Sequence, residues 1–373
     1  MARKKIIHIV LGKANPNRMN GVNRVVHFLA QAQKSIGLEV EVWGLSSNSD
    51  LDETVDRDYD LKIFINGSSR IDSSKLITSI NENNEAIFHL HGGFIRVFSL
   101  LASEIRKAGS NYLFTPHGCF TKGAMAQNKL KKKVFYWLFE RRLIKKAKFV
   151  QCLGYQEKSD LKSLVNKANI ISVPNGQEPI FFNEKAIEPQ EENIVFGYCG
   201  RLDRHHKGLD LLIGGFIKFK QKTQSKNKLW IIGDGPYKET MFRLLRESKL
   251  EDEAVFFGKK FGEEKFNIIS KMDVFFHSSR HEGLPTAVLE ACSLGIPSAV
   301  TPFTSFDRCL ENNNAGWRIN EATIESVYST MLQIAMDEKS NQIGKKGANA
   351  RNMIKRDFTW EKIAESLQDY YNF

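Results

Sequence analysis

The sequence predicts an α/β protein with two domains, each built on a parallel sheet. Short apolar runs alternate with stretches of helical spacing along the chain, and this pattern restarts after a Glu-rich stretch at residues 181–193. Strands that alternate with helices form parallel sheets. The 373 residues, 42% of them hydrophobic, suffice for two cores. We therefore expect a first domain at 1–180, a linker at 181–193 and a second domain at 194–357.

The strands of the first domain are expected where β-branched and aromatic residues cluster. These runs lie at residues 6–11, 38–43, 61–65, 86–90, 112–115, 149–153 and 170–174. The loop after the first run contains Asn20-Gly21 and leads into a helix near Val22. Phosphates approach a doubly wound sheet at such a glycine-containing loop. Gly21 is therefore a candidate phosphate contact, with a plain tight turn as the alternative.

The most informative stretch, residues 275–300, reads FFHSSRHEGLPTAVLEACSLGIPSAV. It predicts a strand, a polar loop, a helix from Pro285 to Leu294 and a second strand. Pro285 suits the first helical position, where its missing N–H has no acceptor, and Gly295 suits the left-handed stop after the last turn. The unit is therefore a strand–loop–helix–strand element of a parallel sheet.

The start of this helix can hold an anion between two acidic side chains. The open amides of Gly283, Leu284 and Thr286 suit a phosphate. Glu282 precedes them in the loop, and Glu290 lies about 7 Å along the helix axis. A diphosphate here would place one hydroxylated ring by each carboxylate, which is the shape of a nucleotide sugar. The alternative is an ordinary βαβ unit with Glu290 in solvent and Glu282 as a helix-start charge.

A second loop contributes cations. The run at 194–198 predicts a strand, followed by CGRLDRHHKGLDLL, in which Arg201 and Lys207 precede a helix opened by Gly208. Two cations near a helix N-terminus can neutralise a diphosphate that leaves with added negative charge. Solvated surface charge is the alternative. Further strands are expected at 229–232, 254–258, 274–276 and 298–301.

These motifs resemble those of a known family. E-G-L-P-x-x-x-x-E followed by A-C-S-L-G-I-P resembles the E-x7-E element of the family-four retaining glycosyltransferases. G-R-L…K-G-L-D, I-G-D-G-P at 232–236 and P-N-G at 174–176 are similar to other segments of that family. The resemblance covers both halves and is strongest in the second. It implies the GT-B fold, in which two Rossmann-like domains with parallel sheets face each other across a cleft.

The resemblance also implies roles for single residues. Glu282 would hold the hydroxyls of the donor sugar and Glu290 those of the ribose, with the diphosphate on Arg201, Lys207 and the helix opening. The donor-binding set is completed at that opening by Gly283, Leu284, Pro285 and Thr286, and by Gly258 near the nucleobase. The family segment that T-P-H-G resembles has a His facing the donor sugar, which makes His117 a site residue. The final segment, 358–373, would be a helix that crosses back onto the first domain.

A structural role is the alternative for each loop histidine. His91, in the H-G-G loop after the run at 86–90, is the second histidine considered for the site. Asp56-Arg57-Asp58 matches the D-x-D motif of metal-dependent transferases. It lies among other acidic residues, however, and this favours a solvated loop. We expect no metal and no cofactor, because cations and a helix end can neutralise the diphosphate.

The function implied by the resemblance is transfer of a sugar, with retention of configuration, from a UDP- or GDP-sugar. The acceptor would be a hydroxyl of a saccharide or lipid-linked saccharide, in surface polysaccharide or glycolipid assembly. Front-face substitution and two displacements both remain open. The alternatives are a nucleotide-sugar epimerase or hydrolase on the same fold, and a non-catalytic nucleotide-sugar-binding protein. The absence of G-x-G-x-x-G after either first strand argues against a dehydrogenase.

The net charge of +11 lies in the first half, where residues 1–180 hold 27 Lys+Arg against 16 Asp+Glu. Residues 129–148 combine nine basic residues with Phe135, Tyr136, Trp137 and Phe139. Such a segment predicts peripheral contact with an anionic membrane, with a helix whose aromatics face the core as the alternative. No nucleic-acid-binding motif accompanies the charge, so nucleic acid is not an expected partner.

The sequence also predicts a cellular location. No apolar run approaches the eighteen or so residues of a membrane span, and residues 6–11 are interpreted as a first buried strand rather than part of a signal peptide. Five cysteines without a C-x-x-C pair fit a reducing compartment. We therefore expect a cytoplasmic protein, peripheral at the inner face of the membrane where 129–148 binds lipid.

Overall fold

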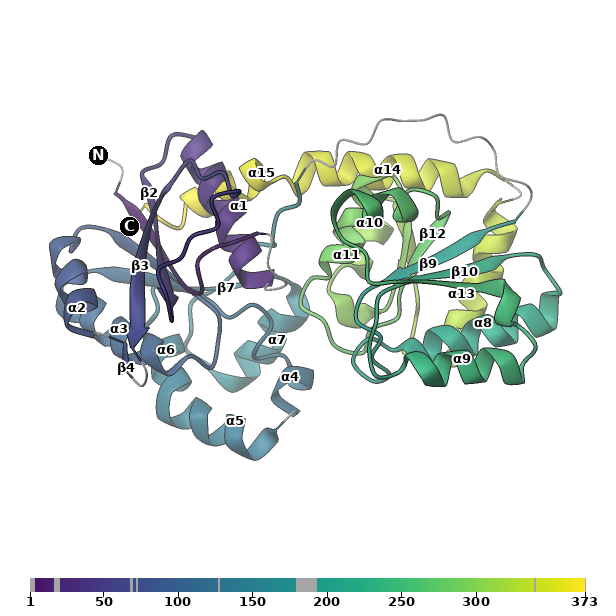
Figure 1. The fold of residues 1–373 in the computed structure, drawn as a ribbon, viewed down its shortest axis with the longest axis horizontal. Helices are drawn as coiled ribbons and strands as arrows, with labels where there is room; N and C mark the ends of the chain where they lie inside the picture. The colour runs from purple at the N-terminus through teal and green to yellow at the C-terminus, as the bar shows by residue number, and fades with distance from the viewer. Residues whose placement is uncertain are drawn as a thin grey trace. The chain divides into compact units, whose positions relative to one another are not determined.

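The computed structural model describes residues 4–16, 21–67, 70–71, 73–126, 128–178, 193–338 and 340–372. The chain divides into two compact units, one formed by Met1–Glu178 with Phe358–Phe373 and the other by Pro179–Asp357. Figure 1 shows each unit as a sheet flanked by helices. The linker expected at 181–193 lies, except for Asn193, outside the described residues.

The first unit contains a sheet with the strand order β4-β3-β2-β1-β5-β6-β7-β8, parallel except for the β3–β4 pair. The strands are β1 (Ile6–Leu11), β2 (Val40–Ser46), β3 (Asp60–Gly67), β4 (Arg70–Ile71), β5 (Ile87–His91), β6 (Asn111–Thr115), β7 (Phe149–Cys152) and β8 (Ile170–Ser172). Strand order reverses between β1 and β5, so their carboxyl ends flank the switch point where ligands bind doubly wound sheets.

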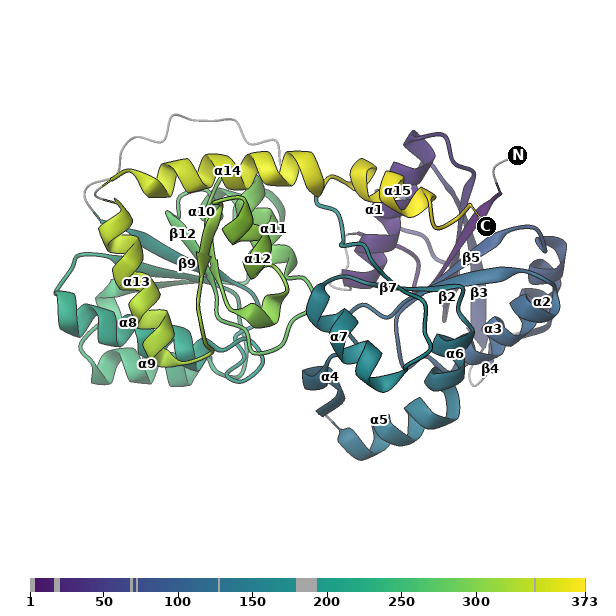
Figure 2. The ribbon, with the colours of Figure 1, turned by 180° about the vertical axis from the view of Figure 1, so that it is seen from behind.

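The helices of the first unit cover both faces of this sheet. They are α1 (Gly21–Ser35), α2 (Ser73–Glu82), α3 (Arg96–Lys107), α4 (Lys122–Ala126), α5 (Lys129–Phe135), a π-helical turn (Tyr136–Glu140), α6 (Arg141–Lys146), α7 (Tyr155–Leu164) and α15 (Trp360–Gln368). Figures 1 and 2 both place α15 beside α1, and the two helices share one apolar core with β1 and β5. The C-terminal segment is thus part of the first unit.

The second unit contains a parallel sheet with the order β11-β10-β9-β12-β13-β14. Its strands are β9 (Val195–Cys199), β10 (Lys228–Ile232), β11 (Ala254–Gly258), β12 (Val274–His277), β13 (Ser298–Val300) and β14 (Gly316–Arg318). Its helices are α8 (Leu209–Thr223), α9 (Lys238–Glu247), α10 (Gly262–Ile269), α11 (Thr286–Ser293), α12 (Asp307–Asn312), α13 (Ile324–Glu338) and α14 (Gln342–Asp357). The order reverses between β9 and β12, which places a second switch point there.

Strand β2 and one additional short strand of the first unit differ from the sequence prediction, and the ends of the other strands shift by at most two residues. Strand β2 begins at Val40 rather than Leu38, because the amides of Gly37 and Leu38 still donate to carbonyls of the preceding helix, Lys34 and Gln33. The short strand β4 was not expected. It pairs antiparallel with the end of β3, where two residues are too few to give a periodic pattern.

Two further observations concern the cysteines and the apolar character of the helices. Each of the five cysteines is free. Among the described residues, no helix combines the length and the apolar character that crossing a bilayer requires.

Candidate functional site

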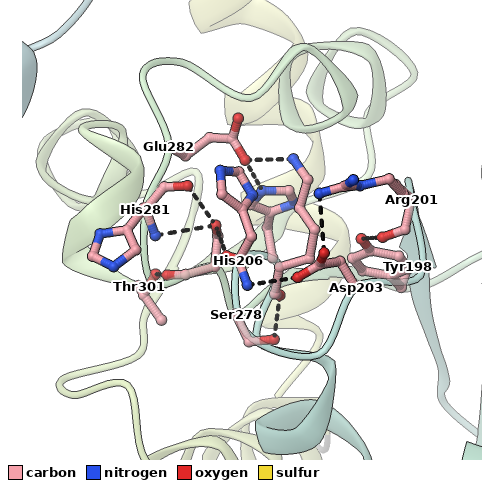
Figure 3. Close-up of polar contacts among 11 residues, drawn as sticks. Tyr198, Arg201, Asp203, His206, Ser278, His281, Glu282 and Thr301 are labelled. Atoms are coloured by element: carbon pink, nitrogen blue, oxygen red, sulfur yellow. Dashed lines mark hydrogen bonds and ion pairs between the residues drawn. The ribbon is translucent and has the colours of Figure 1, made fainter. Parts of the chain in front are cut away.

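Two loops meet at the switch point of the second unit. One follows β9 and the other follows β12, the strands between which the order reverses. Ser278 Oγ donates to the carbonyl of Gly208 at 2.8 Å, and Ser279 Oγ donates to that of His206 at 2.7 Å. The amide of Arg280 donates to the same His206 carbonyl at 3.1 Å. These bonds join the two loops into one body (Figure 3).

A third loop and a helix hold the same body. Thr301 Oγ1, after β13, donates to the Ser279 carbonyl at 2.5 Å. Arg280 forms two parallel bonds to the carboxylate of Asp210 in α8, at 2.8 and 2.9 Å. Bidentate pairs of this kind fix orientation as well as distance. The loop that carries Glu282 is therefore held in place from three sides.

Glycines allow these loops to touch backbone to backbone. Gly208 has φ +63°, and a Cβ there would overlap the carbonyl oxygen of Ser278. A Cβ on Gly233, after β10, would overlap the carbonyl of Gly200, and one on Gly235 would meet the backbone of Leu202. The glycines of the K-G-L-D and I-G-D-G-P segments are therefore required by close contact as well as by turn geometry.

We expect Gly208→Ala to lower the free energy of unfolding of the second unit by about 3 kcal/mol. Alanine pays about 1 kcal/mol for the left-handed backbone, and the rest comes from separating the two loops. Denaturant unfolding of both proteins measures the difference. Gly262→Ala is the matched control, because Gly262 has φ +50° but open space around its Cβ position. Equal losses in the two variants would contradict close contact as the cause.

The joined loops bring Lys207 and Glu282 together. Lys207 Nζ lies 2.5 Å from Glu282 Oε2, and both side chains are about four-fifths buried. His277, the last residue of β12, places its Nε2 3.3 Å from the same oxygen. The sequence predicted the Lys and the Glu as site residues but missed His277, although it ends the strand directly before the Glu282 loop.

The charges in this cluster are set by its contacts. Burial opposes ionisation of Glu282, but Lys207 and His277 outweigh it and hold the pKa of the carboxyl well below its ordinary value. Burial lowers the pKa of His277, against the opposing effect of Glu282. At neutral pH the cluster is therefore an ion pair with a neutral imidazole, whose Nε2–H donates to the carboxylate.

Arg201 occupies the rim of the same edge. Its guanidinium Nη2 lies 3.0 Å from Asp203 Oδ2, and its side chain is 60% exposed. Its backbone carbonyl accepts from the hydroxyl of Tyr198, whose ring stacks on His277. Figure 3 shows the Arg201 guanidinium and the Glu282 carboxylate on the same side of the two loops. Arg201 is thus accessible, whereas Lys207 is held by Glu282.

Helix α11 begins one residue later than predicted. Pro285 is its N-cap, with φ −76° and ψ 110°, and Thr286 is the first helical residue. The extended ψ excludes Pro285 from the helix itself, so the prediction of a first helical position for it was wrong by one residue. The amides of the first turn have no intrahelical acceptor. Gly283, Leu284 and Thr286 lie at this opening as expected.

Glu290 has a partner that the sequence did not indicate. Its carboxylate is buried in α11, and both oxygens accept from Lys265 Nζ of α10 at 2.8 Å. Lys265 also lies over the ring of Phe266, 4.6 Å from its centroid. Any ribose hydroxyl that reached Glu290 would thus meet a carboxylate already oriented by a cation. Nothing in the spacing of Lys265 along the chain signals this contact.

Two glycines named from the sequence lie at loop ends. Gly258 ends β11 with φ +69°, has open space around its Cβ position, and accepts from the amide of Gly233 at 2.8 Å. Gly21 is the first residue of α1 and also faces open space. Residues 17–20 of the preceding loop lie outside the described residues. Phosphate contact by Gly21 and base contact by Gly258 stay predictions.

The histidines of the first unit lie at its own switch point. His117 follows β6 with φ +52°, and its Nε2 lies 3.2 Å from Nδ1 of His91. Glu157 Oε1 accepts from the amide of Gly118 at 2.6 Å and its Oε2 from that of Leu153 at 2.8 Å. The P-H-G turn is therefore anchored by a buried carboxylate beneath it.

Two groups could be considered for a metal. Asp56 and Asp58 of the D-x-D spelling are exposed side chains in the loop before β3. His8, His89 and His91 are buried, with one ring nitrogen of each within 4.8 Å of the others. Each of these nitrogens already lies at hydrogen-bond distance from a protein group. A metal would have to displace those partners.

Two family profiles match consecutive parts of the chain. Residues 19–179 match Glycosyltransferase Family 4 and residues 179–351 match Glycosyl transferases group 1. Together the two profiles cover residues 19–351, and the chain belongs to the glycosyltransferases of this type. The resemblance drawn from the E-x7-E segment is thereby confirmed, and glycosyltransferase activity follows from the family.

Similar glycosyltransferases act in polysaccharide and glycolipid assembly. The UDP-Gal:alpha-D-GlcNAc-diphosphoundecaprenol alpha-1,3-galactosyltransferase of Escherichia coli is 24% identical over 76% of this chain and 74% of its own. The gpi3 subunit of the Schizosaccharomyces pombe phosphatidylinositol N-acetylglucosaminyltransferase is 22% identical over 79% of this chain and 62% of its own. The solved structure of Anabaena Alr3699/HepE with UDP-glucose superposes with a TM-score of 0.73 over 98% of each chain, at 14% identity. This likeness confirms the predicted GT-B fold.

Proposed function

We propose that this glycosyltransferase transfers a sugar from a UDP- or GDP-sugar to a hydroxyl of a saccharide or lipid-linked saccharide, with retention of configuration. One observation carries the proposal: Lys207 and Glu282 lie 2.5 Å apart at the switch point of the second unit, where α11 begins. A buried cation, a carboxylate and a helix N-terminus at one sheet edge suit a diphosphate flanked by sugar rings.

The donor is proposed to lie along this edge. Its diphosphate would contact Lys207, the accessible Arg201 and the amides at the start of α11, which are the positive groups there. Glu282 would accept from hydroxyls of the transferred sugar. Glu290, oriented by Lys265, would accept from the ribose, and Gly258 would face the base. The relative named for UDP-Gal and the neighbour solved with UDP-glucose support this class of donor.

Charge neutralisation is the main task of this site. When the sugar leaves, the nucleoside diphosphate gains negative charge, which preorganised cations and helix amides stabilise without reorganising. Because these groups can neutralise the diphosphate without a metal ion, we propose that the reaction is metal-independent. The leaving phosphate can accept the proton of the acceptor hydroxyl in a front-face route, so the site needs no strong base in that case. Retention by two displacements remains the other route.

Binding and turnover test this proposal. Thermal unfolding is measured with UDP, GDP and ADP, and release of nucleoside diphosphate is then followed with the matching sugars and saccharide or lipid-linked acceptors, with and without EDTA. We expect stabilisation by UDP or GDP and acceptor-dependent, EDTA-resistant release. Conversion of the donor without acceptor would favour an epimerase or hydrolase. Binding without any turnover would favour a nucleotide-sugar-binding protein.

The segment 129–148 has an apolar stripe on its exposed side. Helix α5 continues through the π-helical turn into α6, and the side chains of Leu130, Val134, Trp137 and Leu138 are 77%, 51%, 58% and 66% exposed. This spacing of four, three and one residues places them on one face of a helix. Tyr136 is buried, so the alternative interpretation, in which the aromatics face the core, holds for Tyr136 and not for Trp137.

Basic residues border this stripe. Lys129, Lys131 and Lys133 are exposed in α5, and Arg142, Lys145 and Lys146 in α6. Arg141 lies over the Trp137 ring at 4.6 Å. Exposed apolar side chains bordered by lysines match an anionic lipid surface, where apolar burial and charge attraction add. We therefore propose peripheral attachment through this segment at the cytoplasmic face of the membrane.

Vesicle binding should depend on this stripe. We expect the double change Trp137→Gln with Leu138→Gln to weaken binding to phosphatidylglycerol-containing vesicles roughly 30-fold, since partial burial of two such side chains contributes about 2 kcal/mol. Flotation with graded lipid concentrations measures it. Met336→Gln is the matched control, because Met336 is 65% exposed on α13. Equal binding of wild type to neutral phosphatidylcholine vesicles would argue against the anionic surface.

A further inference from the structure

Four histidines of the first unit gather on one side of its sheet. His8 lies in β1, His89 and His91 lie in β5, and His117 follows β6. The strand register places His8 beside His89 and His91 beside Thr115. His8, His89 and His91 are 0%, 0% and 1% exposed. Packing alone does not explain these three buried imidazoles, because apolar side chains of similar size have a smaller desolvation cost.

A continuous chain of hydrogen bonds links these rings to α1 and to the segment that follows α15. It runs from the Val173 carbonyl through Gln151, Thr115, His89, Tyr371, Gln33, His8 and His91 to His117. The separate distances lie between 2.6 and 3.2 Å. Gln33 comes from α1 and Tyr371 from the C-terminal segment after α15. The last residues of the chain thus complete a network at the switch point.

The first half of this network has one direction. The Val173 carbonyl can only accept, so it faces the amide nitrogen of Gln151, and the Gln151 oxygen accepts the hydroxyl proton of Thr115. The Thr115 oxygen is then left to accept from Nε2–H of His89 at 2.7 Å. Burial lowers the pKa of His89 and keeps it neutral, so its Nδ1 carries a lone pair.

The second half continues in the same direction. Nδ1 of His89 accepts from the hydroxyl of Tyr371, whose oxygen accepts from the Gln33 amide. The Gln33 oxygen accepts from Nε2–H of His8 at 2.6 Å. Neutral His8 then accepts at Nδ1 from Nε2–H of His91, at 2.9 Å.

The chain ends at His117. Nδ1 of His91 accepts from Nε2–H of His117 at 3.2 Å. Every intermediate group thus donates one bond and accepts one bond. A full reversal would set the Gln151 oxygen against the Val173 carbonyl, and a partial one would leave a buried polar group without a hydrogen bond, which is unfavourable.

We propose that this chain of hydrogen bonds from Val173 to His117, here called the relay, holds His117 in its Nε2–H tautomer. Nδ1 of His117 is then a dedicated hydrogen-bond acceptor for a hydroxyl of the ligand. The relay then contains four positioning residues: His8, His91, Gln33 and Tyr371. They determine which ring nitrogen of His117 carries the proton, although not all of them contact that ring. Nδ1 of His117 has no hydrogen-bond partner among the described residues. The tautomer does not depend on the proposed function; only the identification of the hydroxyl as that of a sugar rests on it.

Nitrogen-detected NMR of the full chain labelled with 15N-histidine tests the relay, since two-bond couplings separate protonated from unprotonated ring nitrogens. At pH 7.5 without ligand, we expect His8, His89, His91 and His117 all as the Nε2–H tautomer. His205, a loop histidine of the second unit, serves as the solvent-exposed reference. An Nδ1–H tautomer at any of the four positions would overturn the proposal. Binding of one Zn²⁺ per chain with loss of the three buried resonances would overturn it in favour of a metal site.

Gln33→Met tests whether the direction of the hydrogen bond at His8 determines the tautomer of His117. Methionine keeps the length of the side chain but offers no amide, so His8 loses its fixed acceptor and His117 should become a mixture of both tautomers. Gln31→Met is the matched control, because Gln31 is a partly exposed residue of the same helix whose side chain bonds only to the Asp56 carbonyl among the described residues. An unchanged His117 in Gln33→Met would contradict transmission. If that variant does not fold, the wild-type tautomers still decide. Correct tautomers without turnover of any donor would leave the relay standing and remove the proposed function.

Discussion

We expect Lys207→Ala to lower kcat/KM for the nucleotide-sugar donor by about 10³-fold, the largest loss of any single change in the second unit. Removing one preorganised group from a site of developing negative charge costs about 10²–10³-fold. Here the loss lies at the upper end, because Glu282 also loses its cationic partner and keeps the hydrogen bond from neutral His277. The side chain of Glu282 is 18% exposed and only 2.5 Å from Lys207 Nζ. Without that cation, a carboxylate would face the diphosphate unopposed.

Lys218→Ala is the matched control for this change. Lys218 belongs to α8 of the same unit and forms an ion pair with Glu325 on the surface. Surface pairs contribute little to stability, so we expect kcat/KM within a factor of two of wild type. Initial rates of nucleoside diphosphate release, with donor varied at fixed acceptor, measure both variants. Lys207→Ala with a rate near that of Lys218→Ala would remove the physical basis of the proposed donor site.

The sequence allowed the core of this site to be predicted for a topological reason. Lys207 and Glu282 are 75 residues apart, but each follows a strand that its apolar pattern identifies. Parallel strands that flank a switch point bring the loops after them together. Glycine and proline spacing then located the start of α11 to within one residue. That the two loops meet could be predicted without knowledge of side-chain packing, whereas the roles of Lys207 and Glu282 in binding a donor stay predictions.

The partners of these residues could not be predicted in the same way. Lys265 reaches Glu290 from a helix that docks beside α11, and His277 reaches Glu282 because β12 ends with that side chain inward. The relay in the first unit is a stronger case. Gln33 and Tyr371 are separated by 338 residues and meet only because α15 packs on α1. Contacts of this kind depend on helix docking and strand register, which local patterns do not encode.

The buried histidines should make the first unit acid-sensitive. Burial lowers the pKa of His8, His27 and His117 to about 4 and that of His89 and His91 well below the ordinary value. A histidine whose pKa is lowered by folding does not oppose the folded state above about pH 6.5. Below that pH it binds a proton in the unfolded chain but not in the folded one, which favours unfolding. Five such groups therefore destabilise the fold as the pH falls from about 6.5 towards 4.

Two buried carboxyls act in the opposite direction. Burial raises the pKa of Glu140 and of Glu157 to about 7. A raised carboxyl pKa gives stability below the unfolded value and loses it as the pH rises through 7, so both groups stabilise the fold on acidification. Below about pH 6.5, the unfolded first unit therefore binds about three more protons than the folded one. We expect the first unit to lose roughly 4 kcal/mol of stability per pH unit below about pH 6.5, a large part of the stability of a typical domain.

Hydrogen exchange at pH 7.5 and 5.5, corrected for intrinsic rates, would measure this loss for each unit separately. The second unit should lose less, because its lowered-pKa histidines are His206 and His277 and the pKa of Asp273 is raised to about 6, which opposes them. His27→Gln should reduce by one the number of protons by which the unfolded and folded first unit differ. The loss of stability on acidification should then be smaller by roughly 1.4 kcal/mol per pH unit. His27 contacts Tyr59 rather than the relay, so the change leaves His117 in place. Equal acid sensitivity of the two units would show that the relay histidines are protonated in the folded chain.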